Sequence, residues 1–390
     1  MNVKQAYELL NQAILPEVVG EESVTVEDVT GLVAYGQQID AADAYDNYTR
    51  TIVDVIGKTV FVNRAYEGAF PNLLIDYTEF GSIVRKLSMD IPEAIETEDW
   101  LLENGQSYDP NIFYQPTITE KLFNKRTTFT VPISITERQV KESFHGESEL
   151  VSFMSMIYST IEKTMTIYID SLCRRVISFM VCMNFANGED TPKAVNLLAM
   201  YNDEFGLTGD DVLTADSCLT NPEFIRFAVY KIQDYMKLMN TPTTVFNLDG
   251  KVRFTPKELM RVELLSKFSA AANAYLQSDT FHNEFTELPA ADIVPYWQGS
   301  GTDNSFSECS KISLKDDEAF ADETDHTVTV TGVLGIVWDR DAMAVTHYNK
   351  RVKTRENPVG DFINMWHKWD AQLMAALDEN FCVFYVADES

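Results

Sequence analysis

A long run without proline or glycine, between Gly146 and Gly188, constrains the fold of this chain more than any other feature. Apolar residues recur through 147–183 at the three- and four-residue spacing that places them on one face of an α-helix. A continuous helix here would be about 55 Å long, longer than a small domain is wide. It needs either a coiled-coil partner or a long sheet to lie across, and the loose heptad pattern favours the sheet. The apolar stripe consists of Leu150, Phe153, Met154, Ile157, Ile161, Met165, Tyr168, Leu172, Val176 and Met180.

Alternating apolar and polar residues predict strands on both sides of this helix. One strand covers Phe129–Ile135, and Pro132 places it at a sheet edge or a bulge because proline has no amide hydrogen to donate. Residues 190–345 alternate between helix and strand patterns, which predicts a mixed α+β chain. Its length of 390 residues is enough for about two to three domains. The predicted elements are a helix from Asn221 to about Met239, a buried strand Thr243–Leu248, a helix start at Thr255–Glu258, and strands at Ile293–Trp297 and Gly335–Trp338.

Residues 78–126 predict a long two-stranded excursion. Strand-like ends flank an acidic middle, which is followed by the turn signals Asn104-Gly105 and Asp109-Pro110. Trp100 and Leu101 supply an apolar tip with no local core. A loop of this length indicates a functional segment or one that docks on a partner, with a plain surface insertion as the alternative. The acidic residues are Glu93, Glu96, Glu98, Asp99 and Glu103.

The C-terminal segment contains one ambiguous stretch and one clear strand. In Phe362–Leu377 the aromatic residues fit either a helix or a strand, and residue propensity favours the helix. Phe381–Val386 reads as an apolar strand.

Composition and charge exclude several classes of protein. The net charge of −29 excludes a generally basic nucleic-acid binder, because neutralising phosphates requires Lys and Arg. No stretch reaches the roughly 18 consecutive apolar residues of a membrane span, and the N-terminus has no apolar signal region. The five cysteines are widely spaced without a CxxC pair, which argues against a disulfide framework or a zinc site.

A search for catalytic motifs finds none. The five histidines show no HExxH spacing, and no GxSxG, Walker or GxGxxG motif occurs. Asp339-Arg340-Asp341 could be a metal site or an acid pair, but a hairpin turn between Gly335–Trp338 and Ala342–Val345 is the better interpretation. We therefore predict no catalytic residue, cofactor or metal. A basic cluster, Lys350, Arg351, Lys353 and Arg355, could meet an acidic partner or nucleic acid, with a solvated strand edge as the alternative.

The order of these elements resembles the Hong Kong 97-type major capsid proteins of tailed bacteriophages, and nearly the whole chain shares in the resemblance. An N-terminal arm precedes the excursion, a long helix, an α/β region and a return to the sheet beside the helix. Three stretches look like that family: Val294–Gly301 (VPYWQGSG), Gly332–Val345 (GVLGIVWDRDAMAV), and Arg355–Gly360 (RENPVG) with the aromatic run and terminal strand after it.

The resemblance implies a Hong Kong 97-type fold and a division of the chain. It also implies that 362–377 is a strand beside the long helix, against the helix propensity, so we predict Phe362–Leu373 as a strand in one sheet with Phe381–Val386. The implied parts are an N-terminal arm 1–42, a peripheral domain at 43–77 and 127–189 with the spine helix 147–183, an extended E-loop 78–126, an axial domain 190–345 and peripheral return strands 346–390.

The implied function is structural. The chain would assemble with copies of itself, as hexamers and pentamers, into an icosahedral shell of the virion that encloses double-stranded DNA without sequence-specific binding. It would be made in the host bacterial cytoplasm, need no cofactor and have a portal protein as a further partner. Because only about 40 residues precede the peripheral domain, a separate scaffolding protein is implied. We expect the excursion residues Glu93, Glu96, Glu98, Asp99, Trp100 and Leu101 to contact Arg351, Lys353 and Arg355 of a neighbouring subunit.

Two alternatives remain at this stage. An encapsulin, which is a cellular compartment shell, would have the same fold and would enclose protein cargo. A soluble acidic enzyme belongs to another class and would turn over a small ligand as a discrete monomer.

Overall fold

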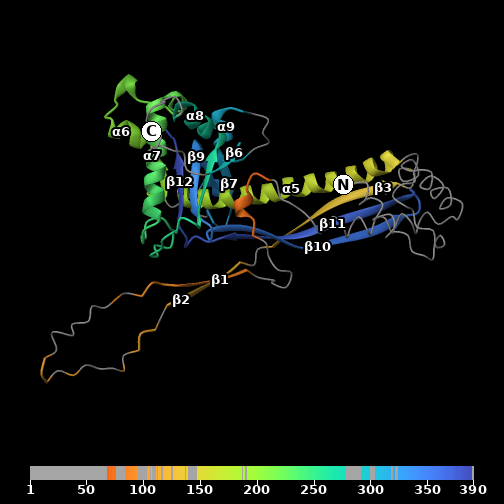
Figure 1. Ribbon diagram of the computed structural model, residues 1–390, viewed down its shortest axis with the longest axis horizontal. Coiled ribbons are helices and arrows are strands. Elements are labelled where there is room, and N and C mark those ends of the chain that lie inside the picture. The colour runs from red at the N-terminus through yellow and green to blue at the C-terminus, as the bar shows by residue number, and fades with distance from the viewer. Residues whose placement is uncertain are drawn as a thin grey trace. The chain divides into compact units, whose positions relative to one another are not determined.

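A computed structural model describes most of the chain beyond residue 67 (Figure 1). The predicted N-terminal arm lies outside the described residues. The described residues are 68–75, 84–92, 94, 103–105, 107, 111, 113–115, 117–123, 126–136, 138, 147–186, 188, 191–276, 291–298, 304–317, 319–320 and 324–388.

The chain divides into two compact units, each built from three separate segments. Unit 1 contains Met1–Phe80, Lys125–Leu172 and Val345–Gln372. Unit 2 contains Gly81–Asn124, Cys173–Ala344 and Leu373–Ser390. The finer division into arm, E-loop, peripheral and axial domains stays a prediction.

Helix α5 (Glu147–Ala186) is a single helix of 40 residues, which confirms the predicted continuous helix. Its predicted stripe is buried at Ile157, Ile161, Met165, Leu172, Val176 and Met180, whereas Tyr168 is 45% exposed. The side chains of Leu150, Phe153 and Met154 lie outside the described residues.

In unit 1 a three-stranded sheet in the order β10-β11-β3 lies beside this helix. Its strands are β3 (Arg126–Thr136), β10 (Met343–Asn357) and β11 (Phe362–Ala375). Phe129 of β3 stacks on Tyr168 of α5 with ring centroids 4.6 Å apart, so the helix lies against a sheet as expected. Strand β3 is an edge strand and contains Pro132, as predicted.

Strand β11 confirms the strand interpretation of Phe362–Leu373. Alternate residues Ile363, Met365 and Trp369 are buried, and Trp369 stacks on Phe129 with ring centroids 5.4 Å apart. The two-residue period of burial matches a strand on an apolar layer and overrides the helix propensity.

Unit 2 contains a five-stranded sheet in the order β4-β12-β9-β5-β6. Its central strands β12 and β9 are buried along their whole length. Tyr235 of α7 packs edge-on against Phe384 of β12, with centroids 5.6 Å apart. The strands are β4 (Ala194–Asn196), β5 (Met260–Leu265), β6 (Asp292–Val294), β9 (Val333–Asp339) and β12 (Phe381–Tyr385), and the helices are α6 (Leu197–Glu204), α7 (Pro222–Met239), α8 (Ser266–Leu276) and α9 (Phe306–Cys309).

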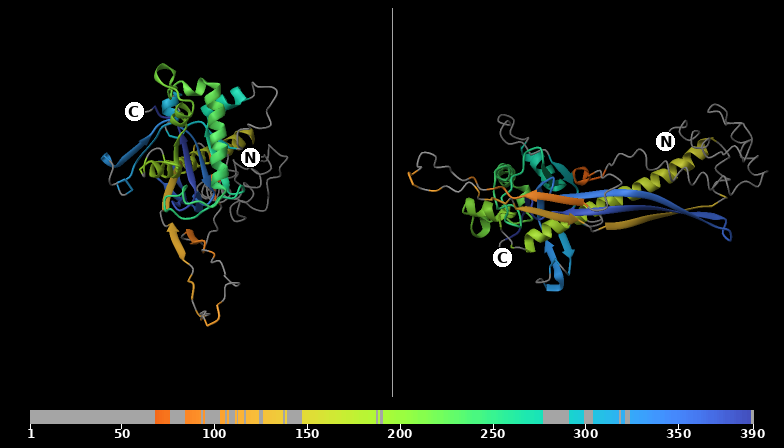
Figure 2. Two further views of the ribbon diagram at one scale, coloured as in Figure 1. Left: turned by 90° about the vertical axis from the view of Figure 1, so that its left-hand side faces the viewer. Right: turned by 90° about the horizontal axis from the view of Figure 1, so that it is seen from below.

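Two further pairs of strands belong to unit 2. Strands β1 (Val84–Met89) and β2 (Ile118–Phe123) pair antiparallel, as predicted for the excursion, and are called the hairpin below. Strands β7 (Ile312–Lys315) and β8 (Thr327–Val330) form a separate ribbon, visible in Figure 2. Short 3-10 helices are η1 (Pro71–Leu73), which lies in unit 1, and η2 (Gly209–Asp211), η3 (Cys218–Thr220) and η4 (Thr324–His326).

The prediction that Phe362–Leu373 shares a sheet with Phe381–Val386 is wrong. Strand β11 lies in the three-stranded sheet and β12 in the five-stranded sheet. The intervening turn redirects the chain: the amide of Ala376 donates to the carbonyl of Ala342 at 2.7 Å, and that of Phe381 donates to the carbonyl of Phe246 at 2.9 Å.

Three local predictions also fail. Thr243–Leu248 is not a strand; Thr243 makes one isolated bridge to Arg253, and the rest is a series of bends. Thr255–Glu258 is one turn before β5 rather than a helix start, because Met260–Leu265 is buried in the sheet between β9 and β6. The turn at Asp339-Arg340-Asp341 exists, but it does not form a hairpin, because β9 and β10 belong to different sheets. The predicted helix from Asn221 is confirmed as α7, with Asn221 as its N-cap.

Candidate functional site

The hairpin presents two chemically different faces. Directly opposed residues of an antiparallel pair lie on the same face, and successive residues of a strand alternate between faces. The register pairs Lys86 with Lys121 and Ser88 with Thr119 on one face. It places Leu87, Met89, Ile118 and Leu122 on the other, where Glu120 lies opposite Leu87 and Arg85 lies opposite Leu122.

The four apolar residues of this second face, which is called the apolar face below, are exposed. Leu87, Met89, Ile118 and Leu122 are 58%, 53%, 64% and 57% exposed. The nearby residues Ile91, Phe113 and Tyr114 are also exposed. Glu120 and Arg85 share this face, but a group of exposed apolar side chains marks an interaction site more often than an isolated exposed leucine does.

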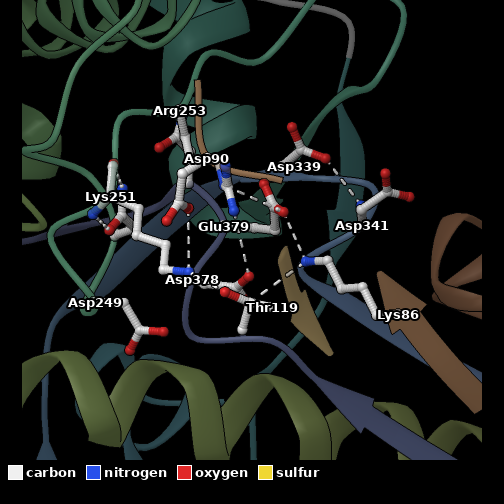
Figure 3. Close-up of polar contacts among 12 residues, drawn as sticks. Lys86, Asp90, Thr119, Asp249, Lys251, Arg253, Asp339, Asp341, Asp378 and Glu379 are labelled. Atoms are coloured by element: carbon white, nitrogen blue, oxygen red, sulfur yellow. Dashed lines mark hydrogen bonds and ion pairs between the residues drawn. The ribbon is translucent and has the colours of Figure 1, made fainter. Parts of the chain in front are cut away.

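The opposite face of the hairpin is charged and faces the turn between β11 and β12. Lys86 and Lys121 are direct cross-strand partners, an arrangement that is unfavourable for like charges unless an anion lies between them. Asp378 supplies that anion: its Oδ1 lies 3.5 Å from Lys86 Nζ and 3.0 Å from Lys121 Nζ. Figure 3 shows Lys86 directed at Asp378 and Glu379, and the distance from Lys86 Nζ to Glu379 Oε1 is 2.7 Å.

Further ion pairs extend this group into a cluster. Lys251 Nζ lies 3.3 Å from Asp90 Oδ1 and donates a hydrogen bond to the hydroxyl of Thr119 at 2.8 Å. Arg253 Nη2 lies 3.7 Å from Asp378 Oδ2. Four cations and four anions are brought together, so the cluster is close to neutral as a whole. The ionic cluster consists of Lys86, Lys121, Lys251, Arg253, Asp90, Asp249, Asp378 and Glu379.

The bend after α7 positions two cations of this cluster, Lys251 and Arg253. Asn247 closes a loop on Lys251: its side-chain amide donates to the carbonyl of Lys251 at 2.7 Å, and its Oδ1 accepts the amide of Lys251 at 2.9 Å. Gly250 adopts a positive φ of 64° at this bend, which favours glycine. These contacts explain why the segment bends where the sequence pattern predicts a strand.

Burial and the neighbouring positive charges shift the pKa values of Asp378 and Glu379 in opposite directions. The Asp378 side chain is fully buried, which alone would raise its pKa, but Lys86 and the hydrogen bond from Lys121 lower the pKa below its usual value. Burial dominates at Glu379 and raises its pKa, although Lys86 partly offsets the effect. Asp378 is therefore the carboxylate that the cluster holds ionised.

Asp339 lies next to the cluster and has a structural partner set. The hydroxyl of Thr255 donates to its Oδ2 at 2.7 Å, and the amide of Asp341 donates to its Oδ1 at 2.9 Å. Burial raises the pKa of Asp339. Within the described part of the chain, no group of three or more His, Cys, Asp or Glu side chains could hold a metal ion.

The structure describes only some of the site residues predicted from the sequence. Arg351 is bound within its own sheet, with Nη1 2.7 Å from Asp370 Oδ2. Lys353 and Arg355 are exposed on β10. The predicted contact residues of the excursion lie outside the described residues: Glu93, Glu96, Glu98, Asp99, Trp100 and Leu101.

Sequence reasoning missed the ionic cluster. The alternation in Val84–Met89 and Ile118–Phe123 signals a two-faced ribbon, but it does not reveal that Lys86 opposes Lys121. Asp378 lies more than 250 residues from both, so no local pattern connects them.

Comparison with known proteins gives a family match over most of the chain. A family model described as "Phi29-like phage major capsid protein" matches residues 12–385. No curated protein matches the chain. Among the described helices, none is long and apolar enough to cross a membrane.

Solved structures with a similar fold come from tailed phages and share little sequence. A chain in the structure of the head fiber and inner core protein gp22 of native bacteriophage P68 has a TM-score of 0.51 and 7% identity, covering 83% of this chain and 86% of that one. The capsid of Staphylococcus phage Andhra gives a TM-score of 0.48 at 9% identity, covering 84% and 86%. The capsid of cyanophage P-SCSP1u gives 0.45 at 12% identity, covering 84% and 91%.

Proposed function

Because the chain belongs to the Phi29-like phage major capsid protein family and is a structural protein of a phage capsid shell, we propose that its hairpin is the arm that joins one subunit to the next. The family membership supports a structural shell protein over the encapsulin and enzyme alternatives. What remains to be assigned is the surface through which copies of this chain meet.

The exposed apolar face of the hairpin carries this proposal. Leu87, Met89, Ile118 and Leu122 are each more than half exposed in the single subunit. A side chain of this size contributes about 1.5–3 kcal/mol when it becomes fully buried. A closed shell repeats the contact at every subunit, so even partial burial adds up over the particle.

Charge complementarity supports a second copy as the partner. The segment between β1 and β2 carries Glu93, Glu96, Glu98 and Asp99 in its sequence, whereas Lys353 and Arg355 are exposed on β10. Each surface pair contributes only about 0–1 kcal/mol. The charges would therefore determine how the two subunits align more than how tightly they bind. Arg351 is already paired with Asp370 and would contribute less to this contact than Lys353 or Arg355.

We extend the proposal to the other partners of the shell. A chain with net charge −29 provides a wall with few groups that bind phosphate, which suits enclosed double-stranded DNA. Hexamers and pentamers, a scaffolding protein and a portal protein would complete the particle, with synthesis in the host bacterial cytoplasm. The subunit itself would have no enzymatic activity.

Removing most of the segment between β1 and β2 without touching the ionic cluster tests the proposal. Replacement of residues 92–112 by a short Gly-Ser turn should leave a soluble subunit with an unchanged circular dichroism spectrum and abolish closed particles in electron micrographs. A milder variant, Leu87→Ser with Leu122→Ser, should slow assembly. Val359→Ser is the matched control, because Val359 is 94% exposed in the turn between β10 and β11. Normal particles from the shortened protein would contradict the proposal.

A further inference from the structure

The ionic cluster connects the hairpin to a turn that is itself firmly held. The turn between β11 and β12 is fixed at both ends by backbone hydrogen bonds, from Ala376 to Ala342 at 2.7 Å and from Phe381 to Phe246 at 2.9 Å. Asn380 adds a side-chain hydrogen bond to the hydroxyl of Thr255 at 3.2 Å. Asp378 therefore presents its carboxylate from a turn that is held at both ends.

The hairpin is unusual in where its apolar residues point. A ribbon that packed on the domain through its apolar side would be held by burial, but here that side is exposed and the charged side faces the domain. Lys86 and Lys121 meet Asp378, and Lys251 reaches Asp90 and the hydroxyl of Thr119 from the domain side. These contacts are electrostatic, so they respond to charge and ionic strength more than apolar packing would.

We propose that Asp378 is an electrostatic latch that seats the hairpin: its buried carboxylate bridges two lysines that face each other across the ribbon, and loss of that charge releases the hairpin from the domain without unfolding it. The latch fixes the direction in which the apolar face points. If the hairpin is the assembly arm, as proposed above, the latch sets whether that arm is presented to a neighbour.

The latch predicts that the loss of Asp378 has a larger effect than the loss of either Lys86 or Lys121. Neutralising Asp378 leaves Lys86 and Lys121 facing each other without the anion that bridges them, because, of these two lysines, Glu379 pairs only with Lys86 and Asp249 only with Lys121. Removing one lysine instead leaves Asp378 paired with the other lysine, so the contact between the hairpin and Asp378 should persist. A structural role in general packing would not produce this asymmetry, because the two lysine stems and the short aspartate side chain would then matter in proportion to their size.

Hydrogen–deuterium exchange of the unassembled subunit tests the latch. Asp378→Asn should speed the exchange of amides in Val84–Met89 and Ile118–Phe123 by about tenfold or more, while amides of β9 stay protected. Asp249→Asn is the matched control: Asp249 contacts Lys121 at 2.8 Å but its side chain is 37% exposed, so exchange should change little. The double variant Asp378→Asn with Lys121→Met should return the hairpin towards wild-type protection, because the facing lysine is gone.

Two outcomes of this experiment would overturn the latch proposal. Unchanged exchange in Asp378→Asn, or a double variant at least as mobile as the single one, would overturn the proposal. If Asp378→Asn does not fold, wild-type exchange measured from about 50 mM to about 1 M NaCl replaces it: the hairpin amides should speed up while β9 does not, and a flat response would overturn the latch. Because no step requires assembly, the latch can fail while the arm proposal stands, and the reverse also holds.

Discussion

Lys86 and Lys121 face each other as direct cross-strand partners of the hairpin, and one oxygen of Asp378 lies within 3.5 Å of both ammonium groups. Two like charges in this position would push the strands apart in the absence of a counter-charge. The buried carboxylate turns an unfavourable pair into the contact that joins the hairpin to the domain. One surface of the hairpin is thereby committed to its own subunit, which leaves the apolar face available to another.

The centre of α5 should tolerate no charge. Leu172 is 5% exposed on the apolar stripe of the helix, so Leu172→Asp would bury a carboxylate without a partner. We expect a loss of about 3–5 kcal/mol in the free energy of unfolding, measured by urea denaturation. Ser171→Asp, at the exposed neighbouring position, should cost less than about 1 kcal/mol. Equal losses in the two variants would show that this face of the helix is not the buried one.

Strands β9 and β5 approach too closely at Gly335 for a larger residue. A Cβ atom there would lie 2.5 Å from Leu264 Cδ2 and 2.9 Å from the carbonyl oxygen of Glu263. Gly335→Ala should therefore destabilise the protein by about 1–3 kcal/mol through strain in the sheet. At Gly360 a Cβ would meet only the ring of Phe362, which can turn aside, so Gly360→Ala should cost less. The ranking can be read from the midpoints of thermal unfolding, and a reversed order would refute the argument.

Glu263 should make stability fall as the pH rises. Its side chain is buried in the five-stranded sheet opposite Asp292, and burial followed by the charge of Asp292 raises its pKa well above 4.5. The folded state therefore holds a proton that the unfolded state releases, and this group's contribution is complete below pH 4.5 and lost as the pH rises through the folded pKa.

The matching experiment compares pH profiles. Between about pH 5 and the folded pKa, wild type should lose up to about 1.4 kcal/mol per pH unit through this group. Glu263→Gln should flatten that slope, whereas Glu258→Gln, at an exposed position, should not. Parallel profiles for wild type and Glu263→Gln would mean that Glu263 does not titrate in this way.

The purified subunit should show neither hydrolase nor transferase activity and should hold no stoichiometric zinc after dialysis. The described residues contain no group of side chains suited to a metal ion, and the family is one of structural shell proteins. Elemental analysis of the dialysed protein measures this directly, and one zinc per chain would contradict the prediction.

The sequence by itself determined the elements whose pattern is local. The periodic stripe of 147–183 specified α5, the alternation around Pro132 specified an edge strand, and Asn221 with Pro222 specified the start of α7. In each case the side chains that set the structure are within a few residues of one another, so their spacing carries the information. The strand at Phe362–Leu373 came from family resemblance, since its propensity pointed to a helix.

Only the tertiary structure decided which segments meet. Thr255–Glu258 has the residues of a helix start, yet the burial of Met260–Leu265 in the sheet prevails. Strands β11 and β12 are separated by one short turn but belong to different sheets. The contact of Lys86 and Lys121 with Asp378 depends on the register of the hairpin and on a turn far along the chain. Register and long-range pairing are fixed by burial and charge summed over the whole fold, and a local pattern of residues does not contain that sum.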